Sequence, residues 1–326
     1  MNAVIGVLCV VLAGAGQAGS RVEKGADDSP FRVVLVGTAG GPTLNPQRAG
    51  IGTLVAAGPE LLLFDCGRGV PTAMVRMALK PVDLTGVFLT HLHSDHVIAL
   101  PELYLYPWAS QGRTVPFRVW GPAGTRAMMR HLQQAFAFDI HVRRDVDERL
   151  SAEGIRAIVT DIHEGVVFDS HGVKVTAFVV DHGAVKPAFG YRVDYQQHSL
   201  VLSGDTRPSD NLIKYASGAD LLIHELGRSK QDPALVGPDD EWLPDHSQTR
   251  HHARMVAAHH TDPVEAGTVL QAARPKLAVF SHYNGAPASI LSLVRQHYAG
   301  PVEFGEDGMT IDIGESVTVR RFVPGR

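Results

Sequence analysis

The chain is poor in cysteine, in basic blocks and in long apolar runs, and each shortage excludes a class of protein. Its 326 residues include only Cys9 and Cys66. A disulfide framework therefore cannot hold the fold, and the cysteine content does not report on the redox compartment. The apolar run at the N-terminus is too short and too rich in glycine for a stable membrane span. Cys9 lacks the small residues that precede a lipidated cysteine.

Positive charge is also scarce. Lys and Arg number 30 and Asp and Glu number 34, which gives a net charge of −4, and no stretch of basic residues is long enough to follow a phosphate backbone. The charge balance therefore argues against nucleic acid as the partner. With 44% hydrophobic residues, the chain has enough apolar side chains for one large core.

Residues 1–18 carry no charged side chain and combine an apolar run with Gly16 and Ala18, a pattern typical of a cleaved secretory signal. We therefore predict a periplasmic or secreted protein with no stable membrane insertion after cleavage. The alternative is a wrongly assigned start and a cytoplasmic protein. A polar linker at 19–30 would precede a single domain at 31–320.

Short apolar runs broken by Gly, Pro and Asp alternate with helical patterns along the domain. Strands are expected at 31–38, 50–58, 61–66 and 86–90, with a helix at 70–80. A second cycle of strand and helix closes the chain: 219–226, 262–274, 276–283, 287–298 and 309–314. This alternation predicts layers of helices and sheets. The long polar stretch 227–252 is expected to be an ordered insertion or a lid.

The stretch THLHSDH, residues 90–96, follows an apolar run and carries the densest group of metal-ligating side chains. His91 and His93 alternate at the expected end of a strand, so both rings point the same way. Asp95 and His96 follow at the turn into a helix and could reach a second point nearby. Zinc prefers imidazole nitrogen and accepts carboxylate oxygen. The alternative is a polar loop that happens to be rich in histidine.

Three further side chains also follow apolar strands: His182 in VVDHG, Asp205 in LSGDT and His282 in VFSHY. Taken singly, Asp205 could cap a helix, and either histidine could lie in the core. Three such positions after three separate strands favour a site with two metal ions.

The order of motifs resembles the metallo-β-lactamase superfamily, whose HxHxDH signature stands here as His91, His93, Asp95 and His96. The series GTAGGP with Arg48, LLLFDCG, HLHSDH, DHG, GDT, HEL, HHTDPVEAG and FSHY is similar to its ribonuclease Z and arylsulfatase-like branch. The resemblance implies an α/β fold, a four-layer αββα sandwich with metals at one edge. It also implies two zinc ions, one held by His91, His93 and His182 and the other by Asp95, His96 and His282, with Asp205 between them. Since di-iron members have a glutamate where this chain has His93, zinc is favoured over manganese or iron.

The resemblance also implies the residues that move protons. Asp95, Glu225 and His260 are the candidates, with Glu225 and His260 acting together on the leaving group. The branch usually has HEAT where this chain has HELG, so the surroundings of Glu225 differ. Glu225 could instead only orient His260. Asp65 is expected behind the metal-binding loop, and His224 beside the ligands.

The sequence predicts a dinuclear zinc hydrolase that uses a metal-bridging hydroxide on a small-molecule ester: an aryl sulfate, a phosphodiester or a lactone. Tyr104, Tyr106 and Trp108 would line an apolar pocket, or else lie in the core. Two alternatives stay open: a ribonuclease Z-like RNA phosphodiesterase, and a metal-binding protein of this fold without catalysis. Against RNA stand the acidic charge, the predicted export and the lack of a basic, Gly/Pro-rich arm between His96 and His182. A homodimer is left open.

Overall fold

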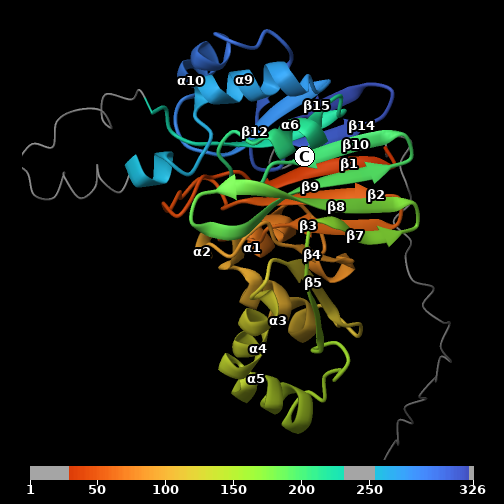
Figure 1. Cartoon of the computed structure of the whole chain (residues 1–326). Coiled ribbons are helices and arrows are strands. Elements are labelled where there is room, and N and C mark those ends of the chain that lie inside the picture. Colours follow the sequence, from red (N-terminus) through yellow and green to blue (C-terminus); the bar gives the residue numbers. More distant parts are fainter. Residues whose placement is uncertain (1–28, 231–253, 323–326) are drawn as a thin grey trace, which may run out of the picture.

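The computed structural model describes residues 29–230 and 254–322, which form two large β-sheets packed face to face with helices on both outer faces (Figure 1). This is the four-layer αββα sandwich expected from the sequence. The predicted signal at 1–18 and most of the predicted linker and 227–252 insertion lie outside the described residues. No helix within the described ranges is both long and apolar enough to span a membrane.

The first sheet has eight strands in the order β15-β14-β1-β2-β3-β4-β5-β6. Its antiparallel part comes from a meander at the start of the chain and a hairpin at its end, and β3 to β6 run parallel. The strands are β1 (Phe31–Gly37), β2 (Gly52–Ala57), β3 (Glu60–Phe64), β4 (Gly86–Phe88), β5 (Phe117–Gly121), β6 (Ala157–Asp161), β14 (Thr310–Ile313) and β15 (Val317–Arg320).

The second sheet has seven strands in the order β13-β12-β11-β10-β9-β8-β7. Strands β10 to β13 are parallel, and β8 runs in the same direction because two antiparallel pairings separate it from β10. The strands are β7 (Gly165–Ser170), β8 (Val173–His182), β9 (Val185–Tyr195), β10 (His198–Leu202), β11 (Leu221–Leu226), β12 (Leu277–Tyr283) and β13 (Val302–Phe304).

Helices form the outer layers. Against the first sheet lie α1 (Val70–Arg76), α2 (Ser94–Val97), α3 (Leu100–Ser110), α4 (Thr125–Ala135) and α5 (Ala137–His141), with single turns η1 (Pro81–Asp83) and η2 (Val142–Val146). Against the second lie α6 (Asp210–Ala216), α9 (Pro263–Ala273) and α10 (Pro287–Val294). As the sequence indicates, Pro263 opens α9, where its missing N–H costs no hydrogen bond.

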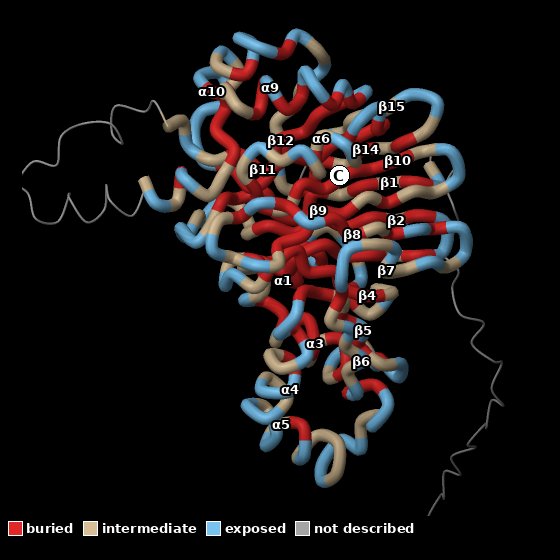
Figure 2. The backbone as a smooth tube through the Cα atoms, viewed as in Figure 1, coloured by how far each residue is buried: buried red, intermediate tan, exposed pale blue. Residues whose placement is uncertain are grey.

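Three apolar clusters hold the layers together, and Figure 2 shows them as buried backbone along the sheets. The cluster between the sheets contains a stacked pair, Phe88 and Trp120, with ring centroids 4.7 Å apart. Of the two alternatives for Tyr104, Tyr106 and Trp108, the core is confirmed for Tyr104 and Trp108, because α3 packs against the first sheet, whereas Tyr106 is only half-buried. Tyr104 and Trp108 are fully buried there and donate hydrogen bonds to the carbonyl oxygens of Ile155 and Ser151. These aromatics therefore belong to the core.

The topology also decides where polar side chains gather. Strands β8, β10, β11 and β12 run the same way, so their carboxyl ends meet at one edge of the second sheet. His182, Glu225 and His282 lie at or near three of these ends, and Asp205 follows the fourth strand. The THLHSDH loop leaves β4 of the first sheet at the same edge.

Candidate metal centre and active site

The loop between β4 and α2 brings the signature side chains together as the sequence predicts. His91 is buried and His93 is exposed, with ring centroids 4.7 Å apart. Asp95 and His96 lie on the short helix α2 that follows. The loop after β4 and the short helix that follows it thus present four ligand-type side chains within six residues.

One group of candidate ligands consists of His91, His93 and His182, whose ligand nitrogens lie within 4.8 Å of one another. His182 comes from the end of β8 in the opposite sheet. Its Nε2 lies 3.2 Å from Nδ1 of His93. Three imidazoles from two sheets therefore converge on one point, as expected for a metal with nitrogen ligands.

The second group consists of Asp95, His96 and His282, also within 4.8 Å. Nε2 of His282 lies 3.2 Å from Oδ2 of Asp95, and Nε2 of His96 lies 3.7 Å from the same oxygen. His282 lies at the end of β12 and has a positive φ of 51°. Residues other than glycine seldom adopt this backbone conformation. Such strain is found at functional sites, where the surrounding structure holds it in place.

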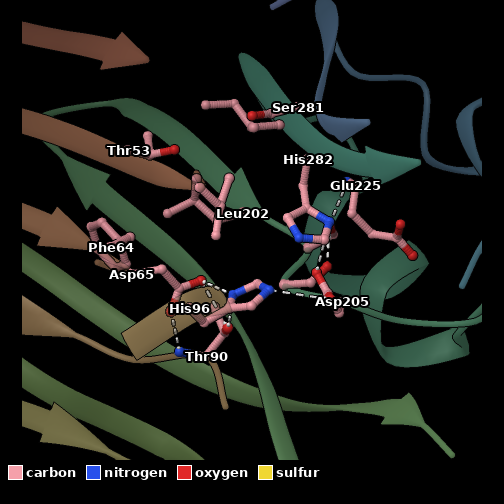
Figure 3. A pocket seen from close by; sticks show the side chains of 14 residues that line it. Thr53, Phe64, Asp65, Thr90, His96, Leu202, Asp205, Glu225, Ser281 and His282 are labelled. Atoms are coloured by element: carbon pink, nitrogen blue, oxygen red, sulfur yellow. Dashed lines mark hydrogen bonds and ion pairs between the residues drawn. The ribbon is translucent and has the colours of Figure 1, made fainter. Parts of the chain in front are cut away.

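Asp205 lies between the two groups, in the loop after β10. Its Oδ2 is 3.2 Å from Nε2 of His96 and 3.9 Å from Nε2 of both His91 and His182, and its Oδ1 is 3.5 Å from Nδ1 of His282. One carboxylate thus reaches ligand atoms of both groups. Figure 3 shows this arrangement, with His96 lying between Asp65 and Asp205 and with His282 beside Asp205.

The Nδ1 atoms of His96 and His182 form hydrogen bonds with groups outside the centre. Nδ1 of His96 lies 2.9 Å from Oδ2 of Asp65, which also accepts a hydrogen bond from the Thr90 hydroxyl. Nδ1 of His182 donates to the carbonyl oxygen of His259 at 3.1 Å. These contacts direct the Nε2 atoms toward the centre of the site and set the tautomer. Asp65 therefore lies behind the loop, as the resemblance implies.

Two observations fit this site to a metal. Nε2 of His91 is buried without a hydrogen-bond partner, an expensive arrangement for a polar atom unless it has another ligand. Burial and the nearby ring of His96 also lower the pKa of His91 well below its usual value, so this ring stays neutral. A neutral imidazole is the form that binds a metal.

The centre is strongly polar in its own right. Burial alone would raise the pKa of Asp205, but the imidazoles of His282 and His96 lower it well below the usual range. Burial alone would lower the pKa of His96, but Asp205 and Asp65 raise it well above its usual value. The charged forms of Asp205 and His96 thus stabilise each other at the centre of the site.

Glu225 and His260 form a second unit beside the ligands. Nδ1 of His260 lies 3.1 Å from Oε2 of Glu225 and 3.9 Å from Oδ2 of Asp205. Oε1 of Glu225 accepts hydrogen bonds from the backbone N–H groups of Thr206 and Thr261. Burial disfavours the imidazolium, but Glu225 more than offsets this and raises the pKa of His260 to about 9. The pair is thus fixed in orientation, with a ring that carries a proton at neutral pH.

The loop with GTAGGP covers another side of the centre. The N–H of Gly41 lies 3.3 Å from Nε2 of His282. Arg48 anchors this loop, because its guanidinium donates to the carbonyl oxygens of Thr38 and Tyr283 and stacks 4.3 Å from the Tyr283 ring. A Cβ at Gly41 would lie 2.1 Å from Asp95, so only glycine fits there.

A cavity of about 390 Å³ opens directly onto the ligands. Besides His93, Asp95, His182, Asp205, His259, His260 and His282, its lining contains Gly41, Pro42, Ser94, Ala184, Val185, Met255 and Val256. The sequence reasoning missed Ala184, Val185, Met255 and Val256, since nothing local in them indicates a pocket. It also left His259 unassigned, although this residue lines the cavity and its carbonyl oxygen orients His182. His224 is buried against Phe280, and its Nδ1 contacts the carbonyl oxygen of Glu225 rather than a ligand.

The model of the Beta-lactamase superfamily domain matches residues 61–283, which span the sheets and the metal-binding loop. The chain belongs to the metallo-β-lactamase superfamily. Within the superfamily, it is 32% identical over 296 residues to ribonuclease Z of Mycobacterium sp. strain KMS, covering 89% of this chain and 99% of that protein. It is 34% identical over 286 residues to ribonuclease Z of Mycobacterium avium strain 104, covering 85% of this chain and 96% of that protein. These relatives place it in the ribonuclease Z branch.

Solved structures of the superfamily align with this chain over most of its length. The short form of human tRNase Z aligns with a TM-score of 0.61 and 26% identity over 87% of this chain and 99% of that one. YhfI of Bacillus subtilis, a metallo-β-lactamase fold protein, aligns with a TM-score of 0.65 over 86% of this chain and 98% of that one. Its sequence identity of 18% supports the fold alone. The chain is therefore a metal-dependent hydrolase that acts on ester bonds. Among the predicted esters, these relatives favour the phosphodiester over the sulfate ester and the lactone.

Proposed function

We propose that the chain is a ribonuclease Z-like phosphodiesterase that binds two zinc ions and cleaves a phosphodiester bond of RNA. The observation that carries this proposal is the position of Asp205, which contacts ligand atoms of both histidine groups beside the Glu225–His260 pair. The identity of 32–34% to ribonuclease Z over nearly the whole chain supports the phosphodiester as the bond.

His91, His93 and His182 would hold one metal ion, Asp95, His96 and His282 would hold the other, and Asp205 would contact both. The donor set of imidazoles and carboxylates suits zinc, and manganese or iron are the alternatives that the same donors accept. When bound, two such ions lower the pKa of water to near neutrality and offset the negative charge of the phosphate.

The residues of the chain supply the remaining steps. His260 faces the cavity at the metal centre and donates its Nδ1 hydrogen to Glu225, which two backbone amides hold in place. Its other nitrogen is left to give a proton to the oxygen of the leaving group. Asp95 is the other candidate donor from the sequence, but its carboxylate faces His282 and His96. We therefore assign the proton transfer to His260 and its positioning to Glu225.

The test is hydrolysis by the purified, zinc-loaded protein of four substrates at equal concentration: a transfer RNA precursor with a 3′ extension, bis(p-nitrophenyl) phosphate, p-nitrophenyl sulfate and an acyl lactone. We expect cleavage of both phosphodiesters and a clear preference for the RNA. Turnover of the sulfate or the lactone without any cleavage of a phosphodiester would overturn the proposal.

A small phosphodiester is a second candidate for the substrate. It is favoured by the charges of the segment between His96 and His182, which contains α3, α4, α5 and η2. Three of its arginines are engaged with acidic neighbours: Arg143 with Asp139 and Glu148, Arg144 with Asp145, and Arg156 with Glu153. Cations paired in this way attract a phosphate backbone less strongly. Cleavage of bis(p-nitrophenyl) phosphate with no cleavage of the RNA precursor would select this candidate.

A further inference from the structure

A small cavity lies on the inner side of the metal centre, between the two sheets, and Figure 3 shows the side chains that line it. Its volume is about 30 Å³. Three of the proposed ligands, His96, Asp205 and His282, line this inner cavity. Asp205 and His282 also line the cavity of about 390 Å³ that opens onto the ligands. These two residues therefore form the wall between the substrate side of the centre and the interior of the sandwich.

The inner cavity combines apolar and polar walls. Phe64, Leu202 and Ile223, which belong to the apolar cluster between the sheets, form part of its lining. Thr53 and Ser281 add two hydroxyl groups, although these residues are only 2% and 1% exposed. Apolar cavities in proteins stay dry, whereas cavities with polar walls bind water. The two hydroxyl groups therefore decide what this cavity can hold.

Ser281 is the more unusual of the two residues. Its hydroxyl group is buried and has no hydrogen-bond partner among the residues that the structure describes. The side chain points into the sandwich, because it alternates along β12 in step with Leu277 and Val279, which belong to the cluster between the sheets. Thr53 belongs to β2 of the opposite sheet, and Figure 3 shows it across the cavity from Ser281. A buried hydroxyl group without a partner destabilises a fold, so a ligand in the cavity is expected to satisfy it.

We propose that the inner cavity binds an internal water molecule, held by the hydroxyl groups of Ser281 and Thr53 and by the carboxylate of Asp205. Its volume exceeds the roughly 10–15 Å³ that one water molecule needs, and three partners is the usual number for a buried water. The Ser281 hydroxyl donates to the water, and the water donates to Asp205, since an ionised carboxylate accepts several hydrogen bonds. Ser281 is thus a positioning residue for Asp205.

The water would hold Asp205 from the side opposite the substrate. The other contacts of this carboxylate are with the ligand rings, at 3.2 Å from Nε2 of His96 and 3.5 Å from Nδ1 of His282. Groups that orient a metal ligand in this way change metal affinity or activity by about ten- to a hundredfold when they are removed. The inference rests on the proposed function, and it adds the buried groups that keep Asp205 between the two metal ions.

The main test compares Ser281→Thr with Ser281→Val, because threonine and valine have the same shape and differ in the hydroxyl group. Ser281→Val should bind zinc about tenfold more weakly in a competition titration with a chelator. At saturating zinc, its kcat on bis(p-nitrophenyl) phosphate should fall with little change in KM, since Ser281 lies behind Asp205 and away from the substrate. Ser281→Thr should keep most of the wild-type affinity. Thr53→Val should weaken zinc binding as well, because the water loses its partner in the opposite sheet.

Val279→Ala is the matched control for packing. Val279 lies two residues before Ser281 on the same face of β12, and it is buried in the apolar cluster without lining the cavity. Its truncation should lower the melting temperature by leaving a gap in the core. Zinc affinity should stay at the wild-type value. The control thus separates a loss of packing from the loss of the water.

A crystal structure that resolves ordered solvent provides the direct observation. The wild-type protein should contain an ordered water in the inner cavity, within hydrogen-bond distance of Ser281, and Ser281→Val should contain none there. A dry cavity in the wild-type protein would overturn the inference, and so would equal zinc affinities of Ser281→Thr and Ser281→Val. The proposed function fails separately, if the wild-type protein binds no zinc or cleaves no phosphodiester, and the crystal structure still decides whether the water is present.

Discussion

At the scale of single residues, the centre depends on one carboxylate and on one hydrogen-bonded pair. Asp205 lies within 4 Å of side chains from both groups of proposed ligands and of His260. His260 lines both the cavity of about 390 Å³ at the ligands and the neighbouring cavity of about 220 Å³, and Glu225 holds its ring. A change at either place should alter chemistry more than stability.

Asp205→Ala should lower the activity about a thousandfold, because both metals lose a shared ligand and with it much of the charge stabilisation of the reaction. Bound zinc, measured by elemental analysis, should fall below two ions per chain. Asp169→Ala removes an exposed carboxylate far from the centre and should leave both quantities unchanged. Two ions and full rate in Asp205→Ala would contradict the site.

His260→Ala should lower kcat by a factor of about 10² to 10⁴ on substrates with an alkoxide leaving group, since loss of a proton donor costs that much. On bis(p-nitrophenyl) phosphate the loss should be far smaller, because p-nitrophenolate leaves without a proton. Glu225→Gln should show the same dependence on the leaving group in weaker form, as expected for a residue that positions His260. An equal loss on both substrate types would mean that His260 binds rather than donates.

At the scale of elements, strand ends and helix starts place these side chains. Helix α9 begins directly after His260 and Thr261, and its start is closed by a capping box: Asp262 accepts from the N–H of Glu265 while Glu265 accepts from the N–H of Asp262. The cap therefore holds the segment that carries the proton donor.

Asp262→Ala should destabilise the protein by about 1 kcal/mol, the usual value of a lost N-cap. The melting temperature should fall by about 2–4 °C for a chain of this size. Because His260 lies two residues before the cap, kcat should fall as well, whereas zinc content should not. Ser209→Ala removes the cap of α6 and serves as the control, since it should lower the melting temperature without lowering kcat.

The starts of the parallel strands give a prediction on pH. Asp220, just before β11, contacts Nζ of Lys276 and accepts from the N–H of Ser199, so it ties three strand starts together. Burial alone would raise the pKa of Asp220, but Lys276 and Ser199 lower it. A lowered folded-state pKa contributes stability above the unfolded-state value near 3.9, and this stability is lost as pH falls.

Asp220→Asn should therefore unfold more easily in urea than the wild type at pH 7, and the difference should shrink as the pH is lowered below about 4. Asp169→Asn changes an exposed carboxyl group and should show little difference at either pH. A constant difference for Asp220→Asn across this range would contradict the assigned role of charge.

At the scale of the whole molecule, the centre joins the two sheets. His91, His93, Asp95 and His96 leave the first sheet, while His182, Asp205 and His282 belong to the second. A bound metal would thus tie the two halves of the sandwich together at one edge. The remainder of the interface is the apolar cluster between the sheets, which does not depend on metal.

Removal of metal by a chelator should lower the melting temperature without unfolding the protein at 25 °C, and added zinc should restore it. The loss follows from linkage, because a ligand that binds only the folded state stabilises it by RT ln(1 + [L]/Kd). The shift should be smaller in Asp205→Ala, which binds metal less tightly. A chelator that leaves the melting temperature of a zinc-loaded sample unchanged would contradict the proposed link between the sheets.

Much of this site could be predicted from sequence for a local reason. His91, His93, His182, Asp205 and His282 each follow a short apolar run, and parallel strands end at a common edge, so their convergence is a property of the pattern. The seven proposed ligands are brought together as expected. The alternation of strands and helices predicts layers of sheets and helices, and the resemblance to the superfamily implies that there are four of them.

Other features depend on contacts between segments far apart in the chain, and no local pattern shows them. Tyr104 and Trp108 have the composition of a pocket wall, but the packing of α3 on the first sheet places them in the core. The opposite holds for Val185 and Met255, which are unremarkable in sequence and line the cavity at the metal centre only because β9 and the segment at 254–257 meet beside it. The sequence alone thus determined the chemistry of the metal centre, because that chemistry lies in residue types at strand ends. Only the tertiary structure decided what surrounds it, because a cavity is made by segments that are far apart in the sequence and close together in the fold.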